Sequence, residues 1–105
     1  MVKISNRLMT AAALVTQGYT LADVGTDHGY IPIYLLQQKK IPAAIAMDIN
    51  EGPLERAKEH IALYGLQAYI QTRLSDGVAA LKPGEVEAVL IAGMGGGPVM
   101  HILKN

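Results

Sequence analysis

The chain has 105 residues, of which half are hydrophobic and 17% are charged; this is typical of a single globular domain and excludes an intrinsically disordered chain. Nine lysines and arginines balance nine acids, so the chain lacks the excess of positive charge that would indicate nucleic-acid binding. The absence of cysteine excludes disulfides, thiolate metal ligands and thiol catalysis. No apolar run approaches the roughly 20 residues of a membrane-spanning helix, and no signal-peptide pattern is evident, so we expect a cytoplasmic protein that does not contact a membrane.

Hydrophobic periodicity, helix caps and glycine or proline boundaries predict helices and strands that alternate along most of the chain. The expected helices cover residues 5–17, 30–39, 51–64 and 98–103. The expected strands cover residues 20–24, 43–47, 69–74 and 88–92. This alternation predicts an α/β fold with a parallel sheet and right-handed crossovers, in which the carboxyl ends of the strands share one edge.

Residues 21–30 combine a short apolar run, two acids and two glycines at the junction of a predicted strand and a predicted helix. Free backbone N–H groups and the helix dipole point into such a loop, which makes it a candidate ligand site. Gly25 matches the first glycine of the dinucleotide fingerprint G-x-G-x-x-G, but Asp27 replaces the second, where a carboxylate repels a pyrophosphate. Asp27 and Asp23 together favour a positively charged ligand, S-adenosylmethionine (SAM) over NAD. The alternative is a glycine loop that only makes a tight turn.

Two further acids stand at the ends of expected strands. Asp48 lies 23 residues after Gly25, close to the spacing of the ribose-binding acid in a Rossmann-type unit. Its alternative role is a helix N-cap, for which Asn50 is the better candidate. Asp76 is placed to accept a hydrogen bond from an adenine amino group, or else to form an Asp-Gly turn. With Asp23, these acids meet at one edge of a parallel sheet and predict an adenosyl ligand.

Weaker signals come from other polar residues and from a glycine cluster. Residues 93–97 are glycine-rich, which lets a large ligand or a flat base approach the backbone, or else forms a flexible loop. Arg7 is poorly placed for the dipole of the first helix, which hints at another role besides that of a solvated arginine. His60 is expected to be a surface or boundary residue and His101 a structural or exposed residue, rather than ligands.

Four segments together resemble the bacterial tRNA (adenine-N1)-methyltransferases that modify an adenine of the D-arm. They are residues 5–8 (SNRL), 23–32 (DVGTDHGYIP), 46–54 (AMDINEGPL) and 91–96 (IAGMGG). The resemblance implies the Rossmann-like fold of a class I methyltransferase, a SAM cofactor, a tRNA substrate and methyl transfer to N1 of adenine.

The residues and the resemblance together give one set of candidate site residues. The expected cofactor-binding residues are Asp23, Gly25, Thr26, Asp27, Gly29, Asp48, Ile49, Asp76, Gly77 and Gly93. The expected catalytic residues are Asp27, His28, Gly93 and Met94, with Tyr30 as a further candidate for contacting the base. No metal ligand is expected.

The implied fold has seven strands and the implied protein has a helical C-terminal domain, whereas this sequence predicts only about four parallel strands. We therefore expect residues 1–105 to be the N-terminal, SAM-binding half of a class I methyltransferase domain. Its alternatives are a SAM-binding module or truncated product without activity of its own, and half of an NAD-dependent oxidoreductase, against which Asp27 argues. The strand over residues 88–92 is expected to leave a bare apolar edge, which predicts self-association.

Overall fold

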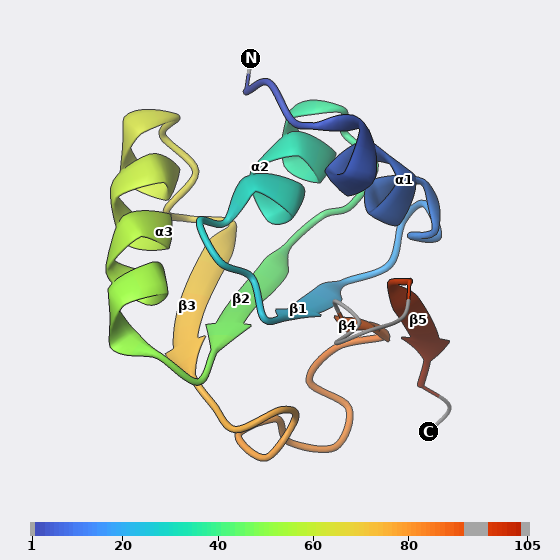
Figure 1. Cartoon of the computed structure of the whole chain (residues 1–105). Helices are drawn as coiled ribbons and strands as arrows, with labels where there is room; N and C mark the ends of the chain where they lie inside the picture. The colour runs from blue at the N-terminus through green and yellow to red at the C-terminus, as the bar shows by residue number, and fades with distance from the viewer. Residues whose placement is uncertain (1, 92–96, 104–105) are drawn as a thin grey trace.

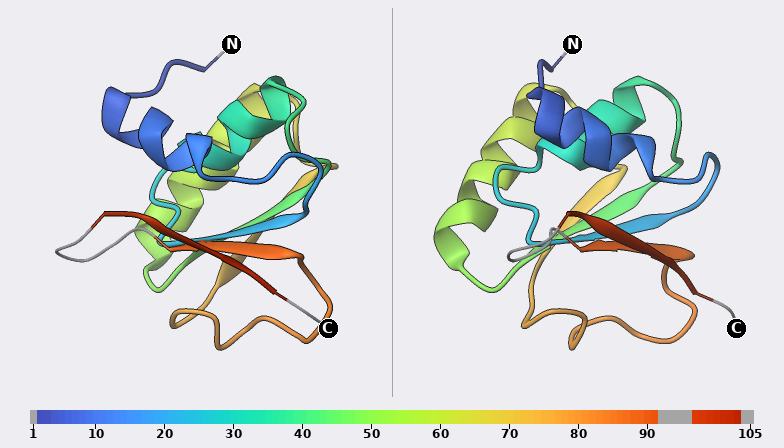
Figure 2. Two further views of the ribbon diagram at one scale, coloured as in Figure 1. Left: turned by 90° about the vertical axis from the view of Figure 1, so that its right-hand side faces the viewer. Right: turned by 45° about the vertical axis from the view of Figure 1, so that its right-hand side comes forward.

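The structure is a computed structural model of the chain, and it describes residues 2–91 and 97–103. Its elements are α1 (Asn6–Ala13), β1 (Leu21–Val24), α2 (Tyr30–Gln37), β2 (Ala44–Asp48), α3 (Glu51–Leu63), β3 (Ile70–Leu74), β4 (Ala88–Ile91) and β5 (Val99–Ile102). Within the described residues, the three helices lie on one face of a sheet, and the segment that joins β3 to β4 crosses the other face (Figures 1 and 2).

The sheet has five strands in the order β3-β2-β1-β4-β5. The first four strands of this order are parallel, with Leu21 of β1 opposite Ala44 of β2 and Ala88 of β4. This confirms the predicted parallel sheet. The carboxyl ends of β1, β2 and β3 consequently lie side by side, so the loops that follow them share one edge.

Helix α1 begins as expected but ends early. The Ser5 side chain accepts the Leu8 N–H at 3.2 Å, which caps the first turn. The helix ends at Ala13 and not near residue 17, because the next two N–H groups bond three residues back and tighten the last turn. Gly18, the residue after the predicted helix, donates its N–H to the Lys40 carbonyl at 2.7 Å, so this glycine belongs to a turn against the end of α2.

The core lies on both faces of the sheet. Between the helices and the sheet, Leu21, Ile33 and Leu35 are fully buried, and α3 adds Ala57 and Ile61 to the same cluster. On the opposite face, Met47 and Val89 pack in a smaller cluster under the β3–β4 segment. Strands that are buried on both faces read as continuous apolar runs, which is why β1, β2 and β4 could be located from the sequence.

One ion pair fastens the β3–β4 segment to the sheet. The Arg73 guanidinium of β3 donates to both carboxylate oxygens of Glu85 at 2.7 Å and to the Ala80 carbonyl at 2.9 Å. The hydrogen bonds from Arg73 are the main reason that the pKa of Glu85 is lowered to about 2. The bidentate geometry fixes the segment across the lower face of the sheet.

Residues 98–103 do not form the predicted last helix. Val99–Ile102 forms β5, which pairs antiparallel with β4, Leu90 lying opposite Met100. The backbone of β4 offers unpaired N–H and C=O groups along its outer edge, and pairing with β5 satisfies them. The predicted bare edge on the fourth strand is therefore wrong, as is the placement of His101 on a helix; His101 is an exposed residue of β5.

Candidate cofactor site at the carboxyl edge of the sheet

The β1–α2 loop (residues 25–29) has an unusual backbone. Gly25, Asp27 and Gly29 all have positive φ angles, of 75°, 58° and 76°. A Cβ atom on Gly29 would lie 3.2 Å from the Cβ of Ala57 on α3, so this glycine is required both by its backbone conformation and by the close approach of the helix. Asp27 is a non-glycine residue in the left-handed region, which needs support from its surroundings.

Asp48, the last residue of β2, gives that support. One of its carboxylate oxygens accepts the Asp27 N–H at 3.3 Å, and the other accepts the Asn50 N–H at 3.0 Å. Asn50 is the N-cap residue of α3, but its side chain makes no capping hydrogen bond. Asp48 therefore joins the loops that follow β1 and β2, and its carboxylate keeps further acceptor capacity toward the shared edge.

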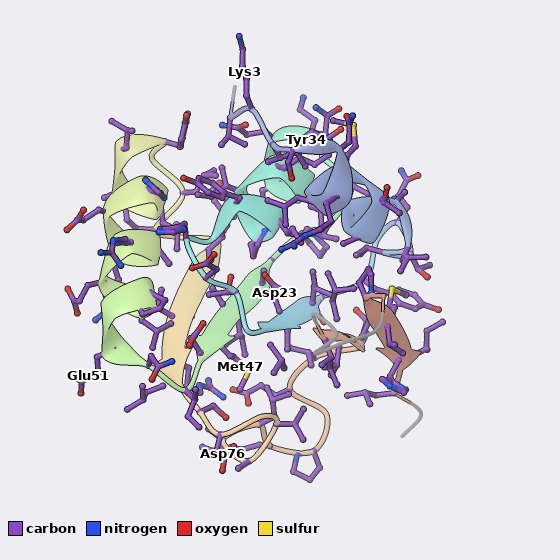
Figure 3. The ribbon with its side chains drawn as sticks, in the orientation of Figure 1. Lys3, Asp23, Tyr34, Met47, Glu51 and Asp76 are labelled. Atoms are coloured by element: carbon purple, nitrogen blue, oxygen red, sulfur yellow. The ribbon has the colours of Figure 1, made fainter. Side chains whose placement is uncertain are left out.

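Asp23 is a buried acid on the side of the sheet that the helices cover (Figure 3). One of its carboxylate oxygens accepts the Thr26 hydroxyl at 2.8 Å. Burial raises the pKa of the Asp23 carboxyl from 3.8 to about 7, opposed by the bond from Thr26 and reinforced by the charge of Asp48. A cation placed beside this carboxyl favours its charged form. Because the carboxyl is already buried, forming such an ion pair does not require it to lose further water.

The loop after β3 lies farther out. Asp76 and Gly77 are exposed, and Figure 3 shows Asp76 on the segment that crosses the lower face of the sheet. Ser75 connects this loop to the site, because its N–H donates to the Asp48 carbonyl at 2.9 Å, while its hydroxyl donates to the Gly77 carbonyl at 2.8 Å. The structure thus brings the turn around Asp76 next to the end of β2. Ile49, the residue that follows β2, has 60% of its surface exposed.

A cavity of about 290 Å³ opens beside the β1–α2 loop, between α1, the start of α2 and the end of β4. Its lining includes Asp23, Thr26, Tyr30 and Leu90, together with Arg7 of α1. The Arg7 side chain makes no hydrogen bond or ion pair with any residue in the described part of the chain. The cavity therefore combines a buried carboxyl group with a guanidinium that has no partner in these residues.

Three aromatic rings cluster at the α2 end of the same loop, and one of them, Tyr30, also lines the cavity. The rings of Tyr30 and His60 stack with centroids 5.1 Å apart at 21°, and His28 lies 5.4 Å from Tyr30 and 5.9 Å from His60. The Nδ1 atom of His60 is 2.9 Å from the His28 carbonyl oxygen, and Nδ1 of His28 is 3.3 Å from a carboxylate oxygen of Asp27. His60 is half-buried, in agreement with the prediction of a surface or boundary residue, but its contact with the loop was not predicted.

Two of the expected site residues, Gly93 and Met94, lie outside the described residues. Among the residues that the structure does describe, no group of three or more His, Cys, Asp or Glu side chains is arranged to hold a metal ion. No helix in this part of the chain is long and apolar enough to cross a membrane.

A parallel sheet whose first loop is glycine-rich and whose strand ends carry acids is the architecture of a Rossmann-like domain. The sequence model of the methyltransferase domain family matches residues 4–105, so the chain belongs to this family. In Rossmann-like folds ligands bind outside the carboxyl ends of the strands, and in this chain that edge carries the β1–α2 loop and Asp48.

Individual proteins similar to this chain include a curated enzyme and two solved structures. The chain is 42% identical to the tRNA (adenine(22)-N(1))-methyltransferase of Bacillus subtilis (strain 168) over 102 residues. This match covers 97% of this chain and 43% of the Bacillus protein. The structure of M. capricolum TrmK with S-adenosyl-homocysteine (SAH) aligns with a TM-score of 0.78 and 41% identity, over 86% of this chain and 41% of that one.

A Streptococcus pneumoniae protein, solved in complex with S-adenosyl-L-methionine, aligns with a TM-score of 0.82 and 43% identity, over 88% of this chain and 44% of that one. The chain therefore spans less than half the length of the relatives that it matches.

Proposed function

We propose that this chain binds SAM at the carboxyl edge of its sheet and forms the cofactor-binding half of an enzyme that methylates N1 of an adenine in tRNA. The observation that carries the proposal is the pairing of Asp48 with the strained β1–α2 loop beside the buried Asp23. The similarity to tRNA (adenine(22)-N(1))-methyltransferase supports the choice of substrate.

The residues at this edge fit an adenosyl cofactor with a positive charge. The left-handed Gly25 carries no side chain, so a ligand can approach the loop backbone there, Gly29 lets α3 pack against the loop, and Thr26 shapes the loop through its bond to Asp23. The free acceptor positions of Asp48 suit the two ribose hydroxyls. Asp23 and Asp27 place negative charge where the sulfonium and ammonium groups of SAM would lie.

The remaining cofactor contacts are assigned to the neighbouring loops. We propose that Asp76 accepts a hydrogen bond from the adenine amino group. We also propose that Ile49 and Gly77 flank the adenine ring, since Ile49 follows the end of β2 and Gly77 lies just after the adjacent strand β3. Gly93 is proposed as a further contact from the loop after β4. When bound, the cofactor supplies an electrophilic methyl group on its sulfonium.

Arg7 is proposed to bind the carboxylate at the amino-acid end of the cofactor. It lines the same cavity as Asp23, and a guanidinium matches a carboxylate with two parallel hydrogen bonds. With Asp23 beside the ammonium group, the two side chains would recognise both charges of the amino-acid end.

Methylation of adenine N1 makes few chemical demands on the protein. Neutral adenine has a lone pair at N1, so no strong general base is needed, and the enzyme must mainly hold N1 about 3 Å from the methyl group. Such positioning contributes about 7–11 kcal/mol at best. We propose that the target base is drawn out of its RNA stack toward the cavity, where Asp27, His28 and Tyr30 contact it, together with Gly93 and Met94 of the loop after β4.

The scope of this chain within the enzyme is also a proposal. Because it spans 43% of the Bacillus subtilis relative, we propose that residues 1–105 are the N-terminal half of the methyltransferase domain, that the tRNA is bound by the complete protein, and that the protein acts in the cytoplasm. A second candidate, favoured by the same coverage, is a SAM-binding module without activity of its own. Self-association through β4 is not proposed, since β5 covers that edge.

Calorimetry with SAH and NAD tests the cofactor assignment on this chain. We expect SAH to bind and NAD not to bind, and preferential binding of NAD would contradict the assignment. Mass spectrometry of tRNA, with and without the gene for the complete protein, tests the reaction. Unchanged 1-methyladenosine in its absence would exclude the proposed substrate, while SAH binding without methyl transfer by the complete protein would favour the module.

A further inference from the structure

We infer that His60 is a positioning residue for the cofactor loop: its imidazole donates a hydrogen bond from Nδ1 to the His28 carbonyl and thereby holds the β1–α2 loop against α3. The inference rests on the proposed SAM site, and it adds to that site a residue of α3. The Nδ1 to carbonyl distance is 2.9 Å, and a carbonyl oxygen can only accept, so Nδ1 carries the proton.

The rest of the loop is fastened by other groups, and this leaves a distinct task for His60. Thr26 donates its N–H to the Met47 carbonyl at 2.8 Å, Asp27 donates to Asp48 at 3.3 Å, and Gly29 donates to the Thr26 carbonyl at 3.1 Å. These bonds hold the loop to β2 and to itself. Within the part of the chain that the structure describes, the bond from His60 is the hydrogen bond that ties the loop backbone to α3.

The position of His60 on α3 explains how it can reach the loop. Ala57 and His60 are three residues apart, so they lie on the same face of the helix. Ala57 packs against Gly29, which brings the backbone of α3 unusually close, and His60 then reaches the carbonyl one residue earlier. The same imidazole stacks on Tyr30, which lines the cavity, so one side chain orients both the loop and the first residue of α2.

Two substitutions separate the hydrogen bond from the ring. His60→Phe keeps an aromatic ring on Tyr30 and removes the donor, whereas His60→Asn places an amide nitrogen where Nδ1 stands and removes the ring. We expect His60→Phe to weaken SAH binding about three- to tenfold, the effect of one net hydrogen bond, and His60→Asn to bind within about twofold of the unmodified chain. Glu59→Ala, an exposed neighbour on α3, is the matched control and should bind normally.

Two further measurements do not depend on the ligand. Nitrogen NMR of the ligand-free chain should find His60 protonated at Nδ1 at neutral pH, and hydrogen exchange should be faster in residues 26–29 of His60→Phe than of His60→Asn. Thermal unfolding followed by circular dichroism identifies any variant that fails to fold. If one does, the tautomer of His60 in the unmodified chain still tests the inference. SAH affinity that is equal in the Phe and Asn variants, or an unprotonated Nδ1, would overturn the inference; failure of the unmodified chain to bind SAH would instead overturn the proposed function.

Discussion

The carboxylate of Asp48 accepts the backbone N–H of Asp27 at 3.3 Å, so the acid at the end of β2 holds the left-handed residue of the loop that follows β1. The two residues are 21 positions apart in the sequence, yet they form one unit, because parallel pairing places the ends of β1 and β2 next to each other. The residue proposed to bind the ribose thus also helps to shape the β1–α2 loop.

This dual role predicts a large effect for Asp48→Ala. The substitution removes the proposed charge-assisted contact to the ribose and leaves the Asp27 and Asn50 N–H groups without their acceptor. We expect SAH affinity to fall by about 1.5–3 kcal/mol, together with a lower melting temperature. Calorimetry and thermal unfolding measure the two effects, with Glu51→Ala as a control that removes an exposed acid from the first turn of α3. Unchanged SAH affinity would refute the ribose assignment.

Gly29→Ala is predicted to destabilise the fold through two separate causes. The residue has φ 76°, and the added Cβ would meet the Cβ of Ala57 at 3.2 Å. Gly18→Ala is the matched control, since its φ of 88° is equally left-handed but nothing lies within 4 Å of the added atom. We expect about 1–2 kcal/mol of backbone strain in both variants and an additional packing cost at Gly29 only. Denaturant unfolding that gives equal losses for the two would exclude the packing contribution.

The predictable part of this molecule is the part set by neighbouring residues. Glycine and proline boundaries, buried apolar runs and acids at strand ends located the parallel strands and the loop that contains Gly25. The fate of residues 98–103 could not be predicted, because six residues show no clear periodicity and their strand conformation depends on pairing with β4. The contact of His60 with His28 spans 32 positions and depends on how closely α3 approaches the loop, which no spacing in the sequence reveals.

The buried acid predicts a pH dependence of stability. The pKa of Asp23 is about 7 in the folded chain and near 3.8 when exposed, so between these values the folded protein keeps a proton that the unfolded chain has lost. Stability therefore decreases as pH rises through this window, by at most about 1.4 kcal/mol per pH unit, and no further above it. Asp23→Asn should remove this contribution. Urea unfolding at pH 5 and pH 8 measures it, and an identical difference in both proteins would contradict the assignment.

Arg7 offers the sharpest test of how the cavity is used. If its guanidinium binds the carboxylate at the amino-acid end of the cofactor, then Arg7→Met must weaken only ligands that carry that end. We expect SAH affinity to fall by about 1.5–3 kcal/mol, while the affinity for 5′-methylthioadenosine, which lacks the amino acid, stays within about twofold. Arg7→Lys keeps the positive charge but loses the planar guanidinium that can form two parallel hydrogen bonds. We expect its SAH affinity to lie between those of the unmodified chain and Arg7→Met.

The comparison between the two ligands also guards against a purely structural effect of Arg7. Loss of the α1 fold would weaken both ligands, whereas loss of a carboxylate partner weakens SAH alone. Lys3→Met is the control for removing a positive charge near the N-terminus, because Lys3 is exposed and does not line the cavity. Equal losses for SAH and methylthioadenosine in Arg7→Met would show that Arg7 holds α1 in place and that the carboxylate is bound elsewhere.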